Sequence, residues 1–215
     1  MRSRAPVLED ATAVLAVLVA RDVADLGVPD FTLEDLRHEW QAVDLDLSAD
    51  ARVVVQDGEI VGYAIVRRRG VMAAVAPDRE GRGIGTRLLR WAEQRERERG
   101  SPRHRQWAVP GSSSQRLLNA AGYQPVGGYW RMSRRLDGTV QAIGAPSGVS
   151  LRPLELDCDA ATICALHAAS FAANADFHPT TVEQFCDEHL YVHDLDVELS
   201  CAAEHELEMV GFLLA

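Results

Sequence analysis

Residues 75–94 read VAPDREGRGIGTRLLRWAEQ, with glycine at every second position from Gly81 to Gly85, between a short apolar run and an arginine-rich helical pattern. A strand that ends in such a turn and then opens a helix directs successive backbone N–H groups, and the positive end of the helix dipole, at one point. Glycines leave that point clear of side chains. The stretch therefore predicts a binding site for a phosphate or pyrophosphate group.

Two common phosphate loops do not fit these residues. A dinucleotide fingerprint, G-x-G-x-x-G, would begin at Gly81 and Gly83 but meets Thr86 where its last glycine is needed. A P-loop needs a lysine, and all 22 basic residues of the chain are arginines. A coenzyme with a pyrophosphate remains, and the alternative is a glycine-rich turn with only a structural role.

Hydrophobic patterns on both sides of the turn predict an α/β protein. Apolar residues recur at helical spacing near the N-terminus, and Thr32 precedes a second helical pattern as an N-cap, with Asp35 at the capping-box position. Asp57 and Gly58 lie between two β-rich runs and indicate a hairpin. In chain order the pattern predicts helices 8–27 and 32–41, strands 51–56, 60–67 and 71–76, helix 84–99, strand 104–109, helix 113–121 and strand 123–136.

The second half of the chain repeats the beginning of the first. Residues 137–148 are rich in Gly, Ala, Ser and Thr and indicate a linker. After it come a strand and helix over 149–171, a helix over 181–190, and strands over 197–204 and 209–215. The segments EIVGYAIV (59–66) and EMVGFLLA (208–215) align closely. We therefore predict a domain over 1–136, a linker, and over 149–215 the first half of a second such domain.

Composition and charge limit the function classes. Hydrophobic residues make up 47% of the 215, which suffices for a globular core. Residues 1–150 carry 21 arginines against 19 acids, and residues 151–215 carry one against 13. This balance disfavours nucleic-acid binding. Residues 67–105 alone hold 12 arginines against five acids, so a small polyanionic ligand is favoured at the glycine turn.

The N-terminus and the cysteines each allow a second interpretation. The apolar run 11–20 imitates a secretory signal, but Glu9 and Asp10 precede it, which favours a buried helix in a cytoplasmic protein. No segment is apolar enough for a membrane span. The cysteines are read as reduced core thiols, so we expect no metal, although Cys164 with His167, and His189 with His193, have the spacing of zinc ligands.

The turn resembles the signature of the GCN5-related N-acetyltransferase (GNAT) superfamily, V-x-P-x-x-[QR]-x-x-G-x-G/A, which grips the pyrophosphate of acetyl-coenzyme A. Val75, Pro77, Gly83 and Gly85 fit, while Glu80 stands at the Gln or Arg position. The two-part organisation resembles the mycothiol synthase group of actinobacterial acetyltransferases. The resemblance implies a GNAT fold, with a mixed central sheet flanked by helices. It implies cofactor binding by Val75, Ala76, Arg79, Gly81, Arg82, Gly83, Ile84, Gly85, Thr86 and Arg87.

The resemblance also implies acetyl transfer to a small-molecule amine by direct attack on the thioester, which calls for a base and an acid. Strand 71–76 lacks the family's glutamate, and Leu118 stands where the family has the tyrosine that protonates the leaving thiolate. Candidates for the missing groups are Glu34, His38 and Glu39 on the second helix, Asp30 before it, Tyr123 and Tyr129. The alternative is a degenerate acyl-CoA-binding or scaffold domain. We expect the exposed edge of the incomplete second sheet to be covered by a neighbouring chain, such as a second copy in a homodimer, by the first domain, or by residues outside this sequence.

Overall fold

The computed structural model describes residues 1–68, 70–130, 132, 134–135, 138, 144–174 and 177–215. Contacts divide the chain into two compact units, Met1–Pro125 and Val126–Ala215. The predicted fold class, α/β in the broad sense that includes α+β, is confirmed, because each unit combines a sheet with helices. All strand pairs among the described residues are antiparallel, and the parallel component of the expected mixed sheet is limited to a bridge between Val71 and Gln106. Among the helices described, none is both long and apolar enough to cross a membrane.

The sheet of the first unit has the order β1-β2-β3-β4, with every pair antiparallel. Its strands are β1 (Arg2–Arg4), β2 (Ala51–Gln56), β3 (Glu59–Arg67) and β4 (Gly70–Val75). The expected hairpin joins β2 to β3, with Asp57 and Gly58 at φ 54° and 88°. Because β3 pairs with β4 from Gly62–Val75 to Arg67–Gly70, the sheet delivers the end of β4 directly to the glycine turn.

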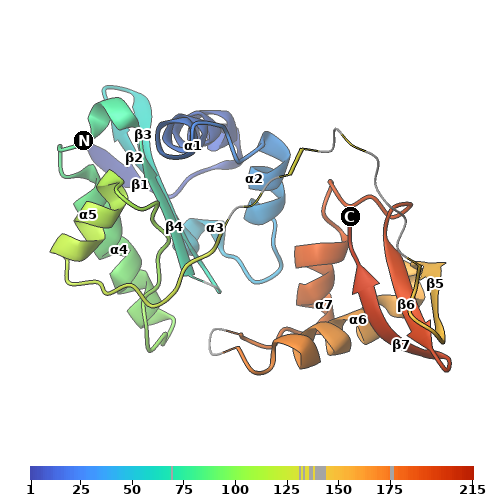
Figure 1. Cartoon of the computed structure of the whole chain (residues 1–215). Helices are drawn as coiled ribbons and strands as arrows, with labels where there is room; N and C mark the ends of the chain where they lie inside the picture. The colour runs from blue at the N-terminus through green and yellow to red at the C-terminus, as the bar shows by residue number, and fades with distance from the viewer. Residues whose placement is uncertain (69, 131, 133, 136–137, 139–143, 175–176) are drawn as a thin grey trace. The chain divides into compact units, whose positions relative to one another are not determined.

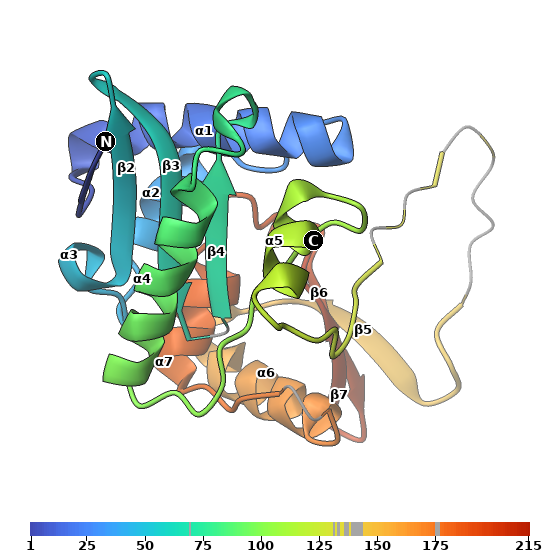
Figure 2. The same ribbon diagram turned by 90° about the vertical axis from the view of Figure 1, so that its left-hand side faces the viewer.

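Helices cover both faces of this sheet, as Figures 1 and 2 show. A one-turn helix, η1 (Leu8–Asp10), leads into α1 (Ala11–Leu26), and α2 (Leu33–Trp40) and α3 (Leu47–Asp50) follow. The first and second of these α-helices bury Val14, Leu18, Leu36 and Trp40 against one face. On the other face lies α4 (Ile84–Glu98), and α5 (Ser113–Ala120) packs beside it. Thr32 caps α2 and forms the predicted capping box with Asp35.

Two predicted strands of the first domain do not form among the described residues. Over 104–109 only Gln106 makes a bridge, parallel to Val71. Residues 123–130, together with 132 and 134–135, are irregular. Pro125 has no N–H to donate, and the glycines at 127 and 128 have no side chains to bury, so this segment gains little from pairing. Its apolar side chains stay in solvent, with Trp130 89% exposed. Half of the predicted linker, residues 137 and 139–143, lies outside the described residues.

The second unit has a sheet of order β5-β6-β7, all antiparallel. It consists of β5 (Val149–Pro153), β6 (Cys201–His205) and β7 (Glu208–Leu213), with α6 (Leu156–Phe171) and α7 (Val182–Phe185) packed against it (Figure 1). The chain continues from α7 as a π-helical turn, Cys186–Leu190. The core of the second unit includes Ile163, Phe185 and Ala202. The four cysteines are free thiols. Cys164 and Cys186 are buried, as predicted for core thiols, whereas that prediction was wrong for Cys158, which is exposed, and for Cys201, which is only partly buried.

Several details recur in the two units at positions 149 residues apart. The backbone has positive φ at Asp57 and Gly58, and again at Glu206 and Leu207. The register of β2 slips between Val54 and Val55, and that of β6 between Ala203 and Glu204.

A strand-to-helix ion pair recurs as well. Both terminal nitrogens of the Arg4 guanidinium, in β1, contact the carboxylate of Asp10. Arg152 of β5 contacts Asp159 in the same way, with N–O distances of 2.6 and 2.8 Å. In each case the arginine lowers the pKa of the aspartate. The two sequences therefore direct the same local structures.

Candidate functional site

The glycine turn connects the end of β4 to the first residue of α4. A single turn of helix, η2 (Pro77–Arg79), comes first, and Gly83 is then the N-cap of α4. Gly81 and Gly83 have φ of 70° and 77°, and a Cβ placed on either would meet nothing within 4 Å. Since the first N–H groups of a helix have no acceptor within the helix, this end of α4 presents donors to open space. That geometry suits an anion.

The third glycine has another role. A Cβ on Gly85 would lie 2.9 Å from Cδ2 of Leu117 on α5, and one on Gly62 of β3 would lie 2.8 Å from Cγ2 of Ile84. These two glycines let α4 pack closely against α5 and the sheet. In the turn, Gly81 and Gly83 thus leave space for a ligand, whereas Gly85 allows close packing of α4.

The arginines around the turn differ in what they contact. Arg79 pairs with Asp78 at 3.1 Å and with Glu59 at 3.3 Å. Arg82 reaches the carbonyl oxygen of Asp78 at 3.4 Å, and both Arg82 and Arg87 are exposed. The last two therefore keep their charges at the surface beside the turn, where they favour an anion.

Glu80, which interrupts the predicted motif, is held by two neighbouring helices. Its Oε1 accepts a hydrogen bond from the Ser113 hydroxyl of α5 at 2.7 Å and is paired with the guanidinium of Arg21 on α1. The hydrogen bond from Ser113, followed by that from Arg21, lowers the pKa of Glu80. The carboxylate is therefore ionised and engaged by α1 and α5.

Of the candidate bases, Glu39 has the most unusual surroundings. Its side chain is 12% exposed, and one oxygen pairs with Arg67 at the end of β3. The other, Oε2, is buried and has no hydrogen-bond partner among the described residues. Burial raises the pKa of Glu39 in spite of Arg67. Because Arg67 pairs with Gly70, this carboxylate lies near the start of β4, at the opposite end from the glycine turn.

The remaining candidates lie in more open positions. Glu34 is exposed on α2, Asp30 is exposed before it, and His38 is half-buried. Tyr129 belongs to the second unit by the division above and is 75% exposed on an irregular segment. Leu118, at the position where a tyrosine was sought, is buried in the first unit.

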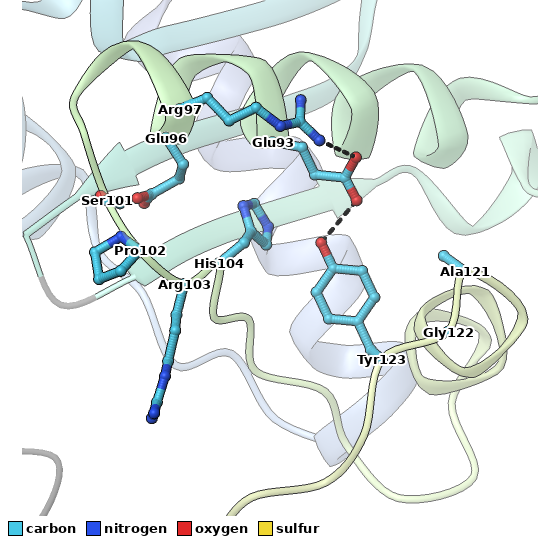
Figure 3. Close-up of a pocket in the computed structure, with 10 residues that line it drawn as sticks. All are labelled: Glu93, Glu96, Arg97, Ser101, Pro102, Arg103, His104, Ala121, Gly122 and Tyr123. Atoms are coloured by element: carbon cyan, nitrogen blue, oxygen red, sulfur yellow. Dashed lines mark hydrogen bonds and ion pairs between the residues drawn. The ribbon is translucent and has the colours of Figure 1, made fainter.

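Tyr123 lines a pocket of about 320 Å³ rather than the turn (Figure 3). Its hydroxyl donates to Oε1 of Glu93 at 2.8 Å, and Glu93 also pairs with Arg97 at 3.6 Å. Burial, together with Glu93, raises the pKa of Tyr123. Glu93 lies ten residues along α4 from Gly83, about 15 Å at the helical rise. The described pocket is therefore separate from the glycine turn.

The structure adds residues that the sequence analysis did not select. Arg21 and Ser113 meet at Glu80, although they lie 92 positions apart in the sequence. His104 faces Tyr123 edge-on in the pocket, with its pKa lowered by burial. One available signal was Arg21 itself, the first charged residue after the apolar run 11–20 of this helical pattern. Among the described residues, no group of His, Cys, Asp and Glu could hold a metal ion.

The chain is similar to several known proteins. Residues 20–123 match the family described as acetyltransferase (GNAT) family. The chain is 32% identical over 181 residues to the curated mycothiol acetyltransferase of Nocardia farcinica (strain IFM 10152), covering 80% of this chain and 55% of that protein. It also resembles the crystal structure of a GCN5-related N-acetyltransferase from Sphaerobacter thermophilus, with a TM-score of 0.71 and 28% identity. That likeness covers 98% of this chain and 70% of the other. The chain therefore spans little more than half the length of its curated relative.

Proposed function

We propose that the first unit of this chain, which matches the GNAT family of acetyltransferases over residues 20–123, transfers the acetyl group of acetyl-CoA to the nitrogen of a small-molecule amine. The observation that carries the proposal is the open turn at Gly81 and Gly83, which precedes the N-terminus of α4. We assign the pyrophosphate to backbone N–H groups of residues 81–86, with Arg82 and Arg87 balancing its charge.

The reaction runs along β4. This strand extends about 17 Å from Gly70 to Val75 at the usual rise of a strand, so an extended pantetheine arm beside it leads away from the turn toward Glu39. The amine nitrogen attacks the thioester carbonyl, the C–S bond breaks, the nitrogen loses a proton and the thiolate gains one. A buried carboxylate with a raised pKa is suited to accept the proton, so we propose Glu39 as the base.

Calorimetry with acetyl-CoA tests the first step, and thiol release on addition of amines tests the second. We expect binding with one site per chain and free coenzyme A when a suitable amine is present. Glu39→Gln should keep the affinity for acetyl-CoA and lower turnover by about two orders of magnitude, the usual contribution of a general base. Glu34→Gln, on the exposed face of the same helix, is the matched control.

A second candidate function is a binding module without turnover. Leu118 favours it, because a buried leucine replaces the family's proton donor. The side chains of β4, GVMAAV, supply no acid or histidine either. Under this alternative, acetyl-CoA binds and no amine in a broad panel releases coenzyme A. Absence of binding would exclude both functions and leave the turn with a structural role.

For the second unit we propose the first part of another GNAT-like domain, over residues 149–215. The recurring strand-to-helix ion pair and hairpin turn support this assignment. In the sheet of this unit, at least half of the surface of each of three apolar residues is exposed: Leu151, Val210 and Leu213. In the first unit, Ala64 and Val61, which precede Leu213 and Val210 by 149 positions, are buried with α4 residues. We propose that a further strand and helix cover the exposed face, supplied by this protein or by a second copy in a homodimer.

A further inference from the structure

Glu80 lies at the junction of three segments that surround the proposed cofactor site. It precedes Gly81 in the turn, accepts a hydrogen bond from Ser113 at the start of α5, and pairs with Arg21 in the second half of α1. Both partners contact the same oxygen, Oε1. The carboxylate is thus directed toward the two helices by contacts from outside the turn.

An uncompensated carboxylate at this position would oppose the proposed ligand. Two like charges near a protein surface repel each other at an effective dielectric constant of about 20, strongly enough to change an affinity tenfold within several ångströms. A pyrophosphate that binds next to Gly81 would experience this repulsion from Glu80. The turn can accept a polyanion only if the charge of Glu80 is neutralised or turned away.

Arg21 is placed to do this. Its side chain is 13% exposed, and Asp25, one helical turn further along α1, holds its second terminal nitrogen at 2.8 Å. The guanidinium is therefore held in place between Asp25 and Glu80. Because one terminal nitrogen contacts each carboxylate, the arginine is oriented more firmly than in an exposed ion pair with a single contact.

We propose that Arg21 is a positioning residue for the cofactor, which acts by offsetting the charge of Glu80 and holding its carboxylate against α1 and α5. In this way a chain with glutamate in its pyrophosphate turn still binds a polyanionic coenzyme. The inference rests on the proposed binding of acetyl-CoA at the turn. It makes Arg21 and Glu80 a compensating pair, in which loss of the arginine matters only while the carboxylate is present.

A double-mutant cycle tests the pair, with coenzyme A affinity measured by calorimetry on the full chain. We expect Glu80→Gln to bind within about threefold of the wild type and Arg21→Met to bind about tenfold more weakly. The double variant Arg21→Met/Glu80→Gln should return to within about threefold of the wild type. The loss in Arg21→Met should also shrink at high salt, because screening weakens the repulsion from Glu80.

Two further variants separate positioning from stability. Arg21→Lys retains a positive charge and should recover most of the affinity, which also covers the case in which Arg21→Met folds poorly. Arg4→Met removes the arginine of the comparable pair with Asp10 and should leave coenzyme A affinity unchanged. Equal weakness of Arg21→Met and the double variant would overturn the inference, as would full affinity in Arg21→Met. No binding by the wild type would overturn the proposed function together with the inference.

Discussion

At the scale of single residues, the turn depends on glycines whose backbone conformation other residues rarely adopt. Gly83 combines a φ of 77° with open space above its Cα, at the N-terminus of α4. Gly100, at the other end of the same helix, has a φ of 74° and equally open surroundings. The two positions therefore share a backbone cost on substitution and differ in whether the proposed ligand lies nearby.

We predict that Gly83→Asp loses more than about tenfold in coenzyme A affinity, because a carboxylate would enter the pyrophosphate site. Gly100→Asp should lose about 1–2 kcal/mol of stability from the same backbone strain and keep its coenzyme A affinity. Calorimetry and thermal unfolding of both variants check this. Equal coenzyme A affinity in the two variants would contradict the assignment of the turn.

Glu39 and Glu80 are both acids of the first unit, yet their environments act in opposite directions. Burial raises the pKa of Glu39, whereas hydrogen bonds from Ser113 and Arg21 lower the pKa of Glu80. A raised pKa in the folded state means that the folded protein binds the proton more tightly than the unfolded chain does. Stability from Glu39 is then present at low pH and is lost as the pH rises.

We predict that the wild type loses stability relative to Glu39→Gln as the pH rises from the ordinary glutamate pKa of 4.5 through the raised value. Chemical denaturation of both proteins at a series of pH values gives the difference in free energy of unfolding. For Glu80→Gln the trend is reversed, since the wild type should lose its advantage as the pH falls through the lowered pKa of Glu80. A difference for Glu39 that rises with pH would show that Arg67 outweighs burial.

At the scale of elements, the close packing of α4 on β3 distinguishes the two units. Gly62 lies under Ile84 and Leu88, at 2.8 and 3.2 Å from where a Cβ would stand. Gly211 is its counterpart 149 residues later, and a Cβ there would meet only the Cβ of Ala203, at 3.7 Å. The same position in the sheet is thus covered by a helix in one unit and open in the other.

We predict that Gly62→Ala destabilises the first unit by about 1–3 kcal/mol through overpacking against α4, while Gly211→Ala changes the stability of the second by less than about 0.5 kcal/mol. Denaturant unfolding followed by hydrogen exchange in each unit measures both effects. A large cost for Gly211→Ala would instead indicate that another segment or a second copy covers β7 in solution.

At the scale of the whole molecule, the proposed ligand site belongs to one of the two units. The open glycine turn and the N-terminus of α4 lie in the first unit. A ligand that binds only the folded first unit stabilises that unit by mass action and leaves an independent unit unchanged.

We predict that coenzyme A at about 100 times its dissociation constant stabilises the first unit by about 2.7 kcal/mol. Hydrogen exchange should show slower exchange around residues 75–90 and no change in β5, β6 and β7. Gly83→Asp is the control and should lose the protection. Protection confined to the second unit would contradict the placement of the cofactor.

Much of this arrangement could be predicted from local sequence. Thr32 with Asp35, Asp57 with Gly58, and the glycine turn are short-range signals, because capping and turn geometry depend on neighbours within a few residues. The predicted hairpin, α2, α4 and α5 are accordingly confirmed. The strands predicted over 104–109 and 123–136 were wrong where the structure describes them, because a strand also needs a partner and a buried face.

The sequence by itself therefore determined the α/β class, the family signature and the likeness between the two halves of the chain. Only the tertiary structure decided the state of two carboxylates: Glu80 is held by Arg21 and Ser113, and Glu39 is buried beside Arg67. The physical reason is that charge and desolvation depend on groups brought together from distant segments. Their effect on a pKa has no signature in the residues next to the carboxylate.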